Sequence, residues 1–152
     1  MKPARLLVPV LGAFLALLLV ATGGTQRALA HKEKHTPDQL RLFEQIFMEQ
    51  VRLGDLLFHG DPATQKTMNV TLTKTGMACA MCHPFGSDNH PYEFPKFQEQ
   101  INKFATLRDM INWCIEKPNE GVKIDSDSDA MKALEAYIYW SNRGSKLDPG
   151  RH

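Results

Sequence analysis

Five consecutive residues, Cys79-Ala80-Met81-Cys82-His83, form the pattern with the most chemical content in this sequence. A C-x-x-C-H pattern is typical of covalent haem attachment, in which each thiol forms a thioether bond to a haem vinyl group. The neutral imidazole of His83 can then coordinate the iron on one axial side. The pattern therefore predicts one haem c, held by Cys79 and Cys82, with His83 as the first axial ligand.

Other uses of a C-x-x-C pair fit this sequence less well. A structural zinc ion takes four ligands, usually supplied as two pairs, and the sequence contains no second C-x-x-C pair. A thioredoxin-like redox pair needs a surrounding βαβ pattern, which is absent. A disulfide between Cys79 and Cys82 would leave the adjacent His83 as a coincidence. Haem attachment is the interpretation that gives all three side chains a role.

The N-terminal residues have the organisation of an export signal. Lys2 and Arg5 make a short basic segment, residues 6–20 are apolar, and Ala28-Leu29-Ala30 resembles an A-x-A cleavage site. The apolar run is shorter than the about 20 residues that comfortably span a membrane. We therefore expect a cleaved signal peptide at 1–30 and a periplasmic domain at 31–152, free of the membrane after cleavage. An uncleaved N-terminal anchor is the alternative.

The expected mature domain has little net charge. Cleavage would remove three basic residues and leave 15 Lys and Arg against 17 Asp and Glu, a formal charge of about −2. The absence of a basic cluster gives no indication of nucleic-acid binding. One domain fits the length. A covalently held macrocycle would supply much of its core, because a chain of this size buries only about two-thirds of its unfolded surface.

Apolar residues recur at helical spacing between Leu40 and Phe58, which predicts an N-terminal helix at about 37–59. Gly54 interrupts this helix at a cost of about 1 kcal/mol relative to alanine, so we expect a close helix crossing there. Ser128 or Asp129 can cap a C-terminal helix. Residues 61–76 are expected to form a loop or a short extended segment. After the haem motif at 79–83, the pattern predicts helices at about 107–116 and 129–142, loops at 84–95 and 121–127, and a loose tail after Gly144.

The haem motif does not identify the second axial ligand. On the expected helix at 107–116, Leu107, Met110, Ile111 and Cys114 follow the i, i+3, i+4, i+7 spacing, which places the Cys114 thiol on the apolar face. A third cysteine in an oxidising compartment could ligate the iron as a thiolate, pair between subunits, or be buried and inert. Thiolate ligation and a buried structural thiol both remain open at this point.

Other side chains compete with Cys114 for the iron. Met131 and Met110 are thioether alternatives, although methionine at helical spacing is more often a core residue than a ligand. Met77 lies only six residues before His83, which makes it hard for Met77 to reach the opposite haem face. His90, in a loop, is better suited to a haem propionate or solvent, and His59 to packing or the surface.

The combination of a helix with Gly-x-x-x-Phe, a C-x-x-C-H motif and an aromatic-rich last helix resembles class I cytochrome c domains. The match covers about residues 47–144, with Gly54 and Phe58 in the first helix and Tyr137 in the last. The resemblance implies an all-α, class I cytochrome c-like helical domain wrapped around one covalently attached haem.

A second resemblance concerns the segment around Cys114. Residues 106–115, followed by Pro118 and Gly121, are similar to the segment that carries the haem-ligating cysteine in thiosulfate dehydrogenases and sulfur-oxidation cytochromes. Phe94-Pro95-Lys96-Phe97 resembles the F-P-x-y segment of those proteins, and Arg108 matches one of their arginines. Small heterodimeric monohaem cytochromes with His/Cys ligation are also similar. The resemblance implies Cys114 as the distal ligand.

The chain also departs from the thiosulfate enzymes. Those proteins carry a second haem domain, whereas this sequence has one C-x-x-C-H motif and lacks the full set of basic residues expected around an anionic sulfur substrate. We therefore expect a low-potential electron-transfer cytochrome, rather than an enzyme, that works with redox partner proteins and forms a homo- or heterodimer. The alternatives are a haem subunit acting on thiosulfate or a related sulfur compound, and a haem protein that binds nitric oxide or carbon monoxide.

Overall fold

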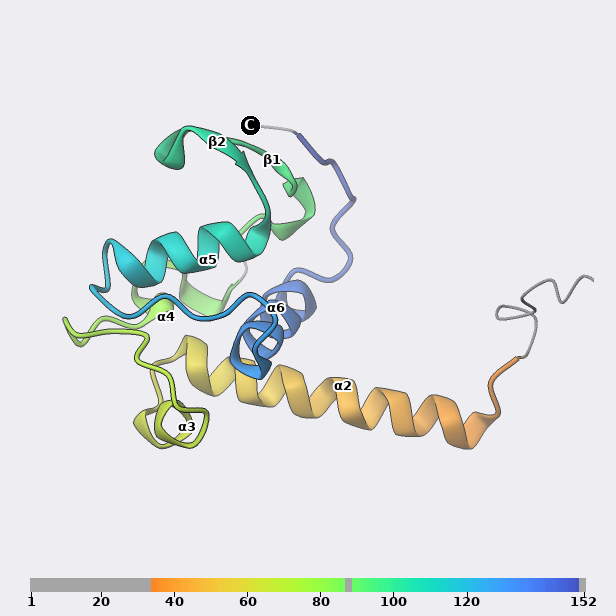
Figure 1. Cartoon of the computed structure of the whole chain (residues 1–152). Coiled ribbons are helices and arrows are strands. Elements are labelled where there is room, and N and C mark those ends of the chain that lie inside the picture. The colour runs from red at the N-terminus through yellow and green to blue at the C-terminus, as the bar shows by residue number, and fades with distance from the viewer. Residues whose placement is uncertain (1–33, 87–88, 151–152) are drawn as a thin grey trace, which may run out of the picture. The chain divides into compact units, whose positions relative to one another are not determined.

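The computed structural model describes residues 34–86 and 89–150 (Figure 1). The expected signal peptide at 1–30 lies outside the described residues. The chain divides into an N-terminal unit, Met1–Thr36, and a second unit, Pro37–His152, which contains every helix and strand of the described residues. Within the described part, no helix combines the length and the apolar composition that crossing a membrane requires.

Helices dominate the second unit, as expected for an all-α domain. The bounds of α5 coincide with the range expected from the sequence, and those of α2 and α6 end one residue earlier. The helices are α2 (Pro37–Phe58), α3 (Pro62–Thr67), α4 (Cys79–Cys82), α5 (Leu107–Glu116) and α6 (Asp129–Ser141), joined by short 3-10 turns at Pro84–Gly86, Pro91–Glu93 and Glu99–Ile101.

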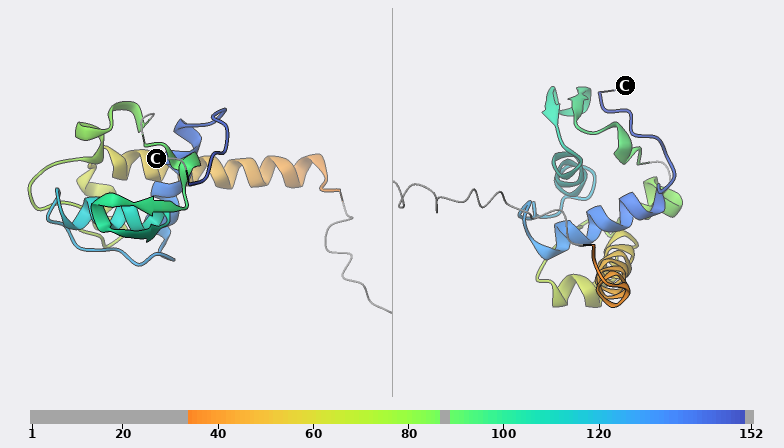
Figure 2. Two further views of the ribbon diagram at one scale, coloured as in Figure 1. Left: turned by 90° about the horizontal axis from the view of Figure 1, so that it is seen from above. Right: turned by 90° about the vertical axis from the view of Figure 1, so that its right-hand side faces the viewer.

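The core forms where the second half of α2 crosses α6 (Figure 2). Gly54 lies at the crossing and lets the two backbones approach, as its position in the sequence predicted. The ring of Phe58 packs on Tyr137 with centroids 5.1 Å apart. The remaining buried side chains of this core include Val51 and Leu57 from α2, Met131, Leu134 and Ile138 from α6, and Leu107 and Ile115 from α5.

The first half of α2 extends beyond this core (Figure 1). Leu40, Phe43 and Phe47 continue the same helical stripe as the buried Val51 and Phe58, but they are 43–53% exposed. Arg41 pairs with Asp38 in this half, and Arg52 pairs with Glu49 further along the helix. An apolar face therefore remains uncovered within the described unit.

Three segments differ from the expectation. Residues 61–76 contain α3 in place of an unbroken loop, because Asp61 caps its first turn by accepting a hydrogen bond from the Thr64 N–H at 2.7 Å. A helix of six residues is too short to show a periodic pattern. Residues 96–105 contain a hairpin of β1 (Lys96–Gln98) and β2 (Lys103–Ala105), in which Phe97 is paired with Phe104.

The C-terminal tail is the third difference, since it is tied to the body and not loose. The N–H of Asp148 donates to the carbonyl of Tyr92 at 3.0 Å, and that of Gly150 donates to the carbonyl of Glu93 at 2.9 Å. These bonds hold the turn at Pro91–Glu93 from outside. The partners lie more than fifty residues apart in the sequence, so no local pattern could reveal them.

Candidate functional site

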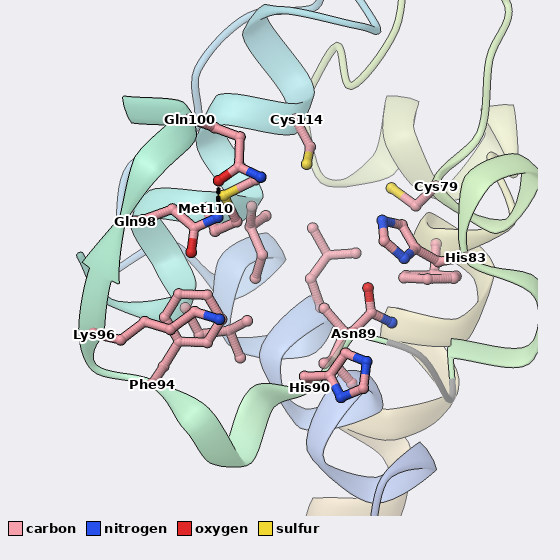
Figure 3. Close-up of a pocket in the computed structure, with 15 residues that line it drawn as sticks. Cys79, His83, Asn89, His90, Phe94, Lys96, Gln98, Gln100, Met110 and Cys114 are labelled. Atoms are coloured by element: carbon pink, nitrogen blue, oxygen red, sulfur yellow. Dashed lines mark hydrogen bonds between the residues drawn. The ribbon is translucent and has the colours of Figure 1, made fainter. Parts of the chain in front are cut away.

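A cavity of about 300 Å³ lies between α4, the segment around residues 89–100, α5 and α6 (Figure 3). Apolar side chains form most of its surface, among them Phe58 from α2, Leu107 and Ile111 from α5, and Leu134 and Ile138 from α6. These residues belong to the core cluster or pack against it. The crossing of α2 and α6 thus builds one side of the cavity.

Sulfur and nitrogen donors enter this cavity from two different walls (Figure 3). Cys79 and His83 point into it from the α4 segment, while Met110 and Cys114 point into it from α5. The sequence predicted that Cys114 and His83 would serve one site, and the fold brings them to one cavity. Met110, one helical turn before Cys114, shares that wall.

The cysteine end of this cavity adjoins a second one of about 220 Å³. Cys79, His83, Met110 and Cys114 line both, and the second cavity adds Cys82. Trp113, Pro118 and Asn119 form its other wall. The two thiols of the C-x-x-C-H motif therefore lie at one end of the whole hollow.

The opposite end is polar. His90 and Lys96 line the main cavity and also an outer cavity of about 750 Å³, whose other residues include Tyr92, Glu93 and Lys146. The Lys96 ammonium donates to Glu93 at 2.7 Å, and the His90 ring lies 2.8 Å from the Tyr92 hydroxyl. The amide of Gln98 donates to Gln100 on the wall between Lys96 and Cys114 (Figure 3). Sequence reasoning missed Lys96, Gln98 and Gln100, for which the short strand β1 offered no periodic signal.

The other candidate residues lie away from the space between Cys114 and His83. Met131 is completely buried in the core and lines neither the main cavity nor the one at Cys82. His59 is half-exposed and pairs with Asp55 at 2.9 Å. Met77 lines neither of those two cavities. His90 lines the polar end, the place that the sequence suggested for a propionate contact or solvent.

Two sets of hydrogen bonds hold α5, the helix that carries Cys114. Thr106 and Asp109 form a capping box at its start, in which each side chain accepts a hydrogen bond from the other residue's backbone N–H. Asn112, 3% exposed, donates to the Ile124 carbonyl and accepts from the Ile124 N–H, both at 2.9 Å. Sequence reasoning missed Asn112, because an amide on a helix gives no signal of a partner twelve residues away.

Arg108, which resembles an arginine of the sulfur-oxidising proteins, binds a residue of α6 and the segment before it. Its guanidinium donates to Glu135 at 2.8 and 3.1 Å and to the Ser126 carbonyl at 3.0 Å. The hydrogen bonds to Glu135, and then the charge of that carboxylate, raise the pKa of Arg108. Arg108 ties α5 to α6 and lines neither cavity that contains Cys114.

The thiols of Cys79 and Cys114 are partly buried, whereas Cys82 is exposed. Burial raises the pKa of Cys79 to about 11, and the charge of Cys114 adds to the rise. Burial likewise raises the pKa of Cys114 to about 11, with a smaller contribution from the charge of Cys82. Without a metal, both thiols are therefore protonated at neutral pH, and a thiolate at Cys114 requires a cation to stabilise it.

This donor set fits a covalently bound haem. The hollow offers an apolar slot for a macrocycle, two thiols at one end, an imidazole on one wall and sulfur donors on the facing wall. The polar end carries the Lys96 ammonium and the His90 ring. A bound haem contributes an iron centre that exchanges single electrons.

A helical domain with a C-x-x-C-H segment at the edge of an apolar hollow defines a c-type cytochrome domain. Residues 65–147 match the family model described as SoxA/TsdA, cytochrome c domain, and the chain belongs to this family. The match confirms the predicted class I-type cytochrome c domain and its covalently bound haem c.

The chain is also similar to a curated protein. It is 26% identical over 131 residues to a thiosulfate dehydrogenase of Psychrobacter arcticus, and the alignment covers 81% of this chain and 39% of that protein. The chain therefore spans less than half the length of this relative.

Proposed function

We propose that this protein is a periplasmic monohaem cytochrome that transfers single electrons between redox proteins. Its haem is attached through Cys79 and Cys82, and its iron has His83 and Cys114 as axial ligands. The observation that carries this proposal is that His83 and Cys114 project into one apolar cavity from different walls. Export through cleavage after residue 30 agrees with covalent haem attachment outside the cytoplasm.

Cys114 is favoured over the methionines by its surroundings. It lies on a helix held at its start by the Thr106–Asp109 box and at its middle by Asn112. Met131 is locked in the core. Met110 shares the wall with Cys114 and is the remaining alternative ligand. The two residues are one helical turn apart on α5, so both sulfurs lie on the same face of the helix.

Thiolate ligation favours a low reduction potential. The thiolate brings a negative charge to the iron and stabilises the ferric state more than a neutral thioether does. Axial ligands shift haem potentials over a span of about 0.8 V. When Cys114 fills the sixth position of the iron, carbon monoxide binding is disfavoured. A gas-binding protein would instead bind carbon monoxide.

The charges around Cys114 favour electron transfer over turnover of thiosulfate. The wall beside Cys114 carries the neutral Met110, Gln98 and Gln100. Lys96 is paired with Glu93 and lies at the end of the hollow away from the motif cysteines, and Arg108 is engaged by Glu135. A small sulfur oxyanion needs uncompensated cations or aligned donors. Action on a sulfur compound stays as the second candidate because the relative from Psychrobacter arcticus is a thiosulfate dehydrogenase.

A dimer is supported by the uncovered face of α2. The apolar stripe of Leu40, Phe43 and Phe47 continues the face that packs on α6, and the helix charges pair elsewhere. A half-helix without tertiary packing is marginal in water. We favour a second copy as its cover, because antiparallel pairing sets Leu40 of one copy against Phe47 of the other.

Near-infrared magnetic circular dichroism of the oxidised mature protein tests the ligand assignment. A charge-transfer band typical of thiolate supports His83/Cys114, and a thioether band in its place refutes it. The same sample is then mixed with thiosulfate, which should leave the ferric haem oxidised. Thiosulfate-dependent reduction at a catalytic rate would establish the second candidate. Carbon monoxide binding to the ferrous protein would favour the gas-binding alternative.

A further inference from the structure

Lys96 is a buried cation in the wall of the haem cavity. Its residue exposure is 9%, although lysine is almost never buried without a partner of opposite charge. Of the described residues that line the main cavity, Lys96 is the only one that is a lysine or an arginine. The residues proposed to attach the haem and ligate its iron do not account for an ammonium in this wall.

The Lys96 side chain is aimed at the cavity. It extends from β1 over the Phe94 ring, with the ammonium 5.1 Å from the ring centroid, and its tip is directed inward (Figure 3). Glu93, 7% exposed, accepts one hydrogen bond from it at 2.7 Å. An ammonium has three donors, so Lys96 can serve Glu93 and a second acceptor together.

The position of Lys96 relative to the cysteines points to that acceptor. Cys79 and Cys82 lie at one end of the hollow, and Lys96 lies at the other, where the main cavity meets the outer polar cavity. Thioether bonds to the two cysteines would hold the vinyl-derived edge of a haem at the first end. The edge that bears the two carboxylates would then face the second end.

We propose that Lys96 binds a haem propionate and that Glu93 positions the ammonium for this contact. A carboxylate taken into a largely apolar cavity requires a charged or hydrogen-bonding partner. A buried lysine–glutamate pair is by itself weak evidence for stability, so a role toward the cofactor accounts for its retention in the cavity wall. The proposal depends on the covalent haem and is independent of the identity of the distal ligand.

Resonance Raman spectra of the oxidised holo-protein test the contact directly, through the bending bands of the haem carboxylates. We expect K96M to shift one of these bands and K96R, which keeps a donor, to retain most of the native position. K146M is the matched control: Lys146 lines the outer cavity but not the main one, and its loss should leave the bands in place. Unshifted bands in K96M would overturn the proposal.

Reduction potentials add a second readout. K96M leaves two carboxylates uncompensated beside the haem, which stabilises the ferric state, so the potential should fall. E93Q removes a competing negative charge, so the potential should rise. Shifts of the same sign in both variants would contradict the arrangement. If K96M fails to accumulate as holo-protein, E93Q decides the question: freeing the ammonium from Glu93 should shift the same carboxylate band and raise the potential, and an unshifted band would overturn the proposal.

Distal-ligand spectra separate this proposal from the functional one. The near-infrared charge-transfer band should be the same in K96M, K96R and the unmodified protein, because Lys96 is not an iron ligand. A thioether band in all three would refute Cys114 ligation while leaving the propionate contact intact.

Discussion

A Cβ atom placed on Gly54 would lie 1.9 Å from the carbonyl oxygen of Ala133. It would also lie 2.7 Å from the Cβ of Tyr137. Two backbones therefore meet at this point, and neither contact can be relieved by rotating a side chain. The crossing sets the position of α6 against α2, and hence of Leu134 and Ile138 in the cavity wall.

Gly54→Ala should destabilise the holo-protein by about 3 kcal/mol or more, at the upper end of the range for overpacking, because the obstacle is backbone. Thermal unfolding followed at the haem Soret band measures the loss. Gln45→Ala, on an exposed turn of the same helix, controls for a general effect of alanine in α2. Equal stability of the two variants would contradict the close crossing.

Cys114→Met should raise the reduction potential, on the order of 100 mV or more, because a neutral thioether replaces a thiolate. Spectroelectrochemical titration measures the potential. Met110→Leu is the matched control on the same wall and should leave both the potential and the near-infrared band nearly unchanged. If Met110→Leu changes the near-infrared band and Cys114→Met does not, Met110 and not Cys114 is the distal ligand of the iron.

Asp109→Asn should weaken α5 in a pH-dependent way. The Thr106 N–H donates to the Asp109 carboxylate and holds its pKa below the usual range. Stability from this carboxylate is therefore present above its unfolded-state pKa and disappears as the pH falls through the lower folded-state pKa. We expect a loss of about 1 kcal/mol at neutral pH.

Urea unfolding of the Asp109→Asn protein and the unmodified protein at several pH values measures this difference. The gap in unfolding free energy should narrow as the medium becomes acidic. Glu44→Gln, on the exposed half of α2, should show no comparable pH-dependent gap. A gap for Asp109→Asn that stays constant with pH would assign the effect to something other than the carboxylate charge.

Phe43→Glu with Phe47→Glu should convert a dimer to a monomer. Each substitution places a charge in an apolar contact, and loss of a central aromatic typically weakens association by at least about 2 kcal/mol. Sedimentation equilibrium of the mature holo-protein measures the assembly. Gln45→Glu adds the same charge to another face of α2 and should leave the dimer intact. An unmodified protein that is monomeric at all concentrations would refute the proposed pairing.

Local patterns in the sequence were sufficient for the chemistry and for most helices. The C-x-x-C-H motif predicted haem attachment because its residues are adjacent, and the 107–116 helix emerged from its own periodicity and cap. Gly54 indicated a crossing because glycine is unfavourable inside a helix unless space is restricted. Each of these inferences used residues within about one or two helical turns of each other.

The tertiary structure alone decided which residues share a cavity. Met110 and Met131 both follow helical spacing, yet one lines the cavity with Cys114 and the other is buried in the core. Lys96 reaches the haem cavity because the β1–β2 hairpin presents it there, and Arg108 is directed to Glu135 on another helix. These outcomes depend on contacts between segments distant in the chain, where the packing of whole elements determines the direction of each side chain.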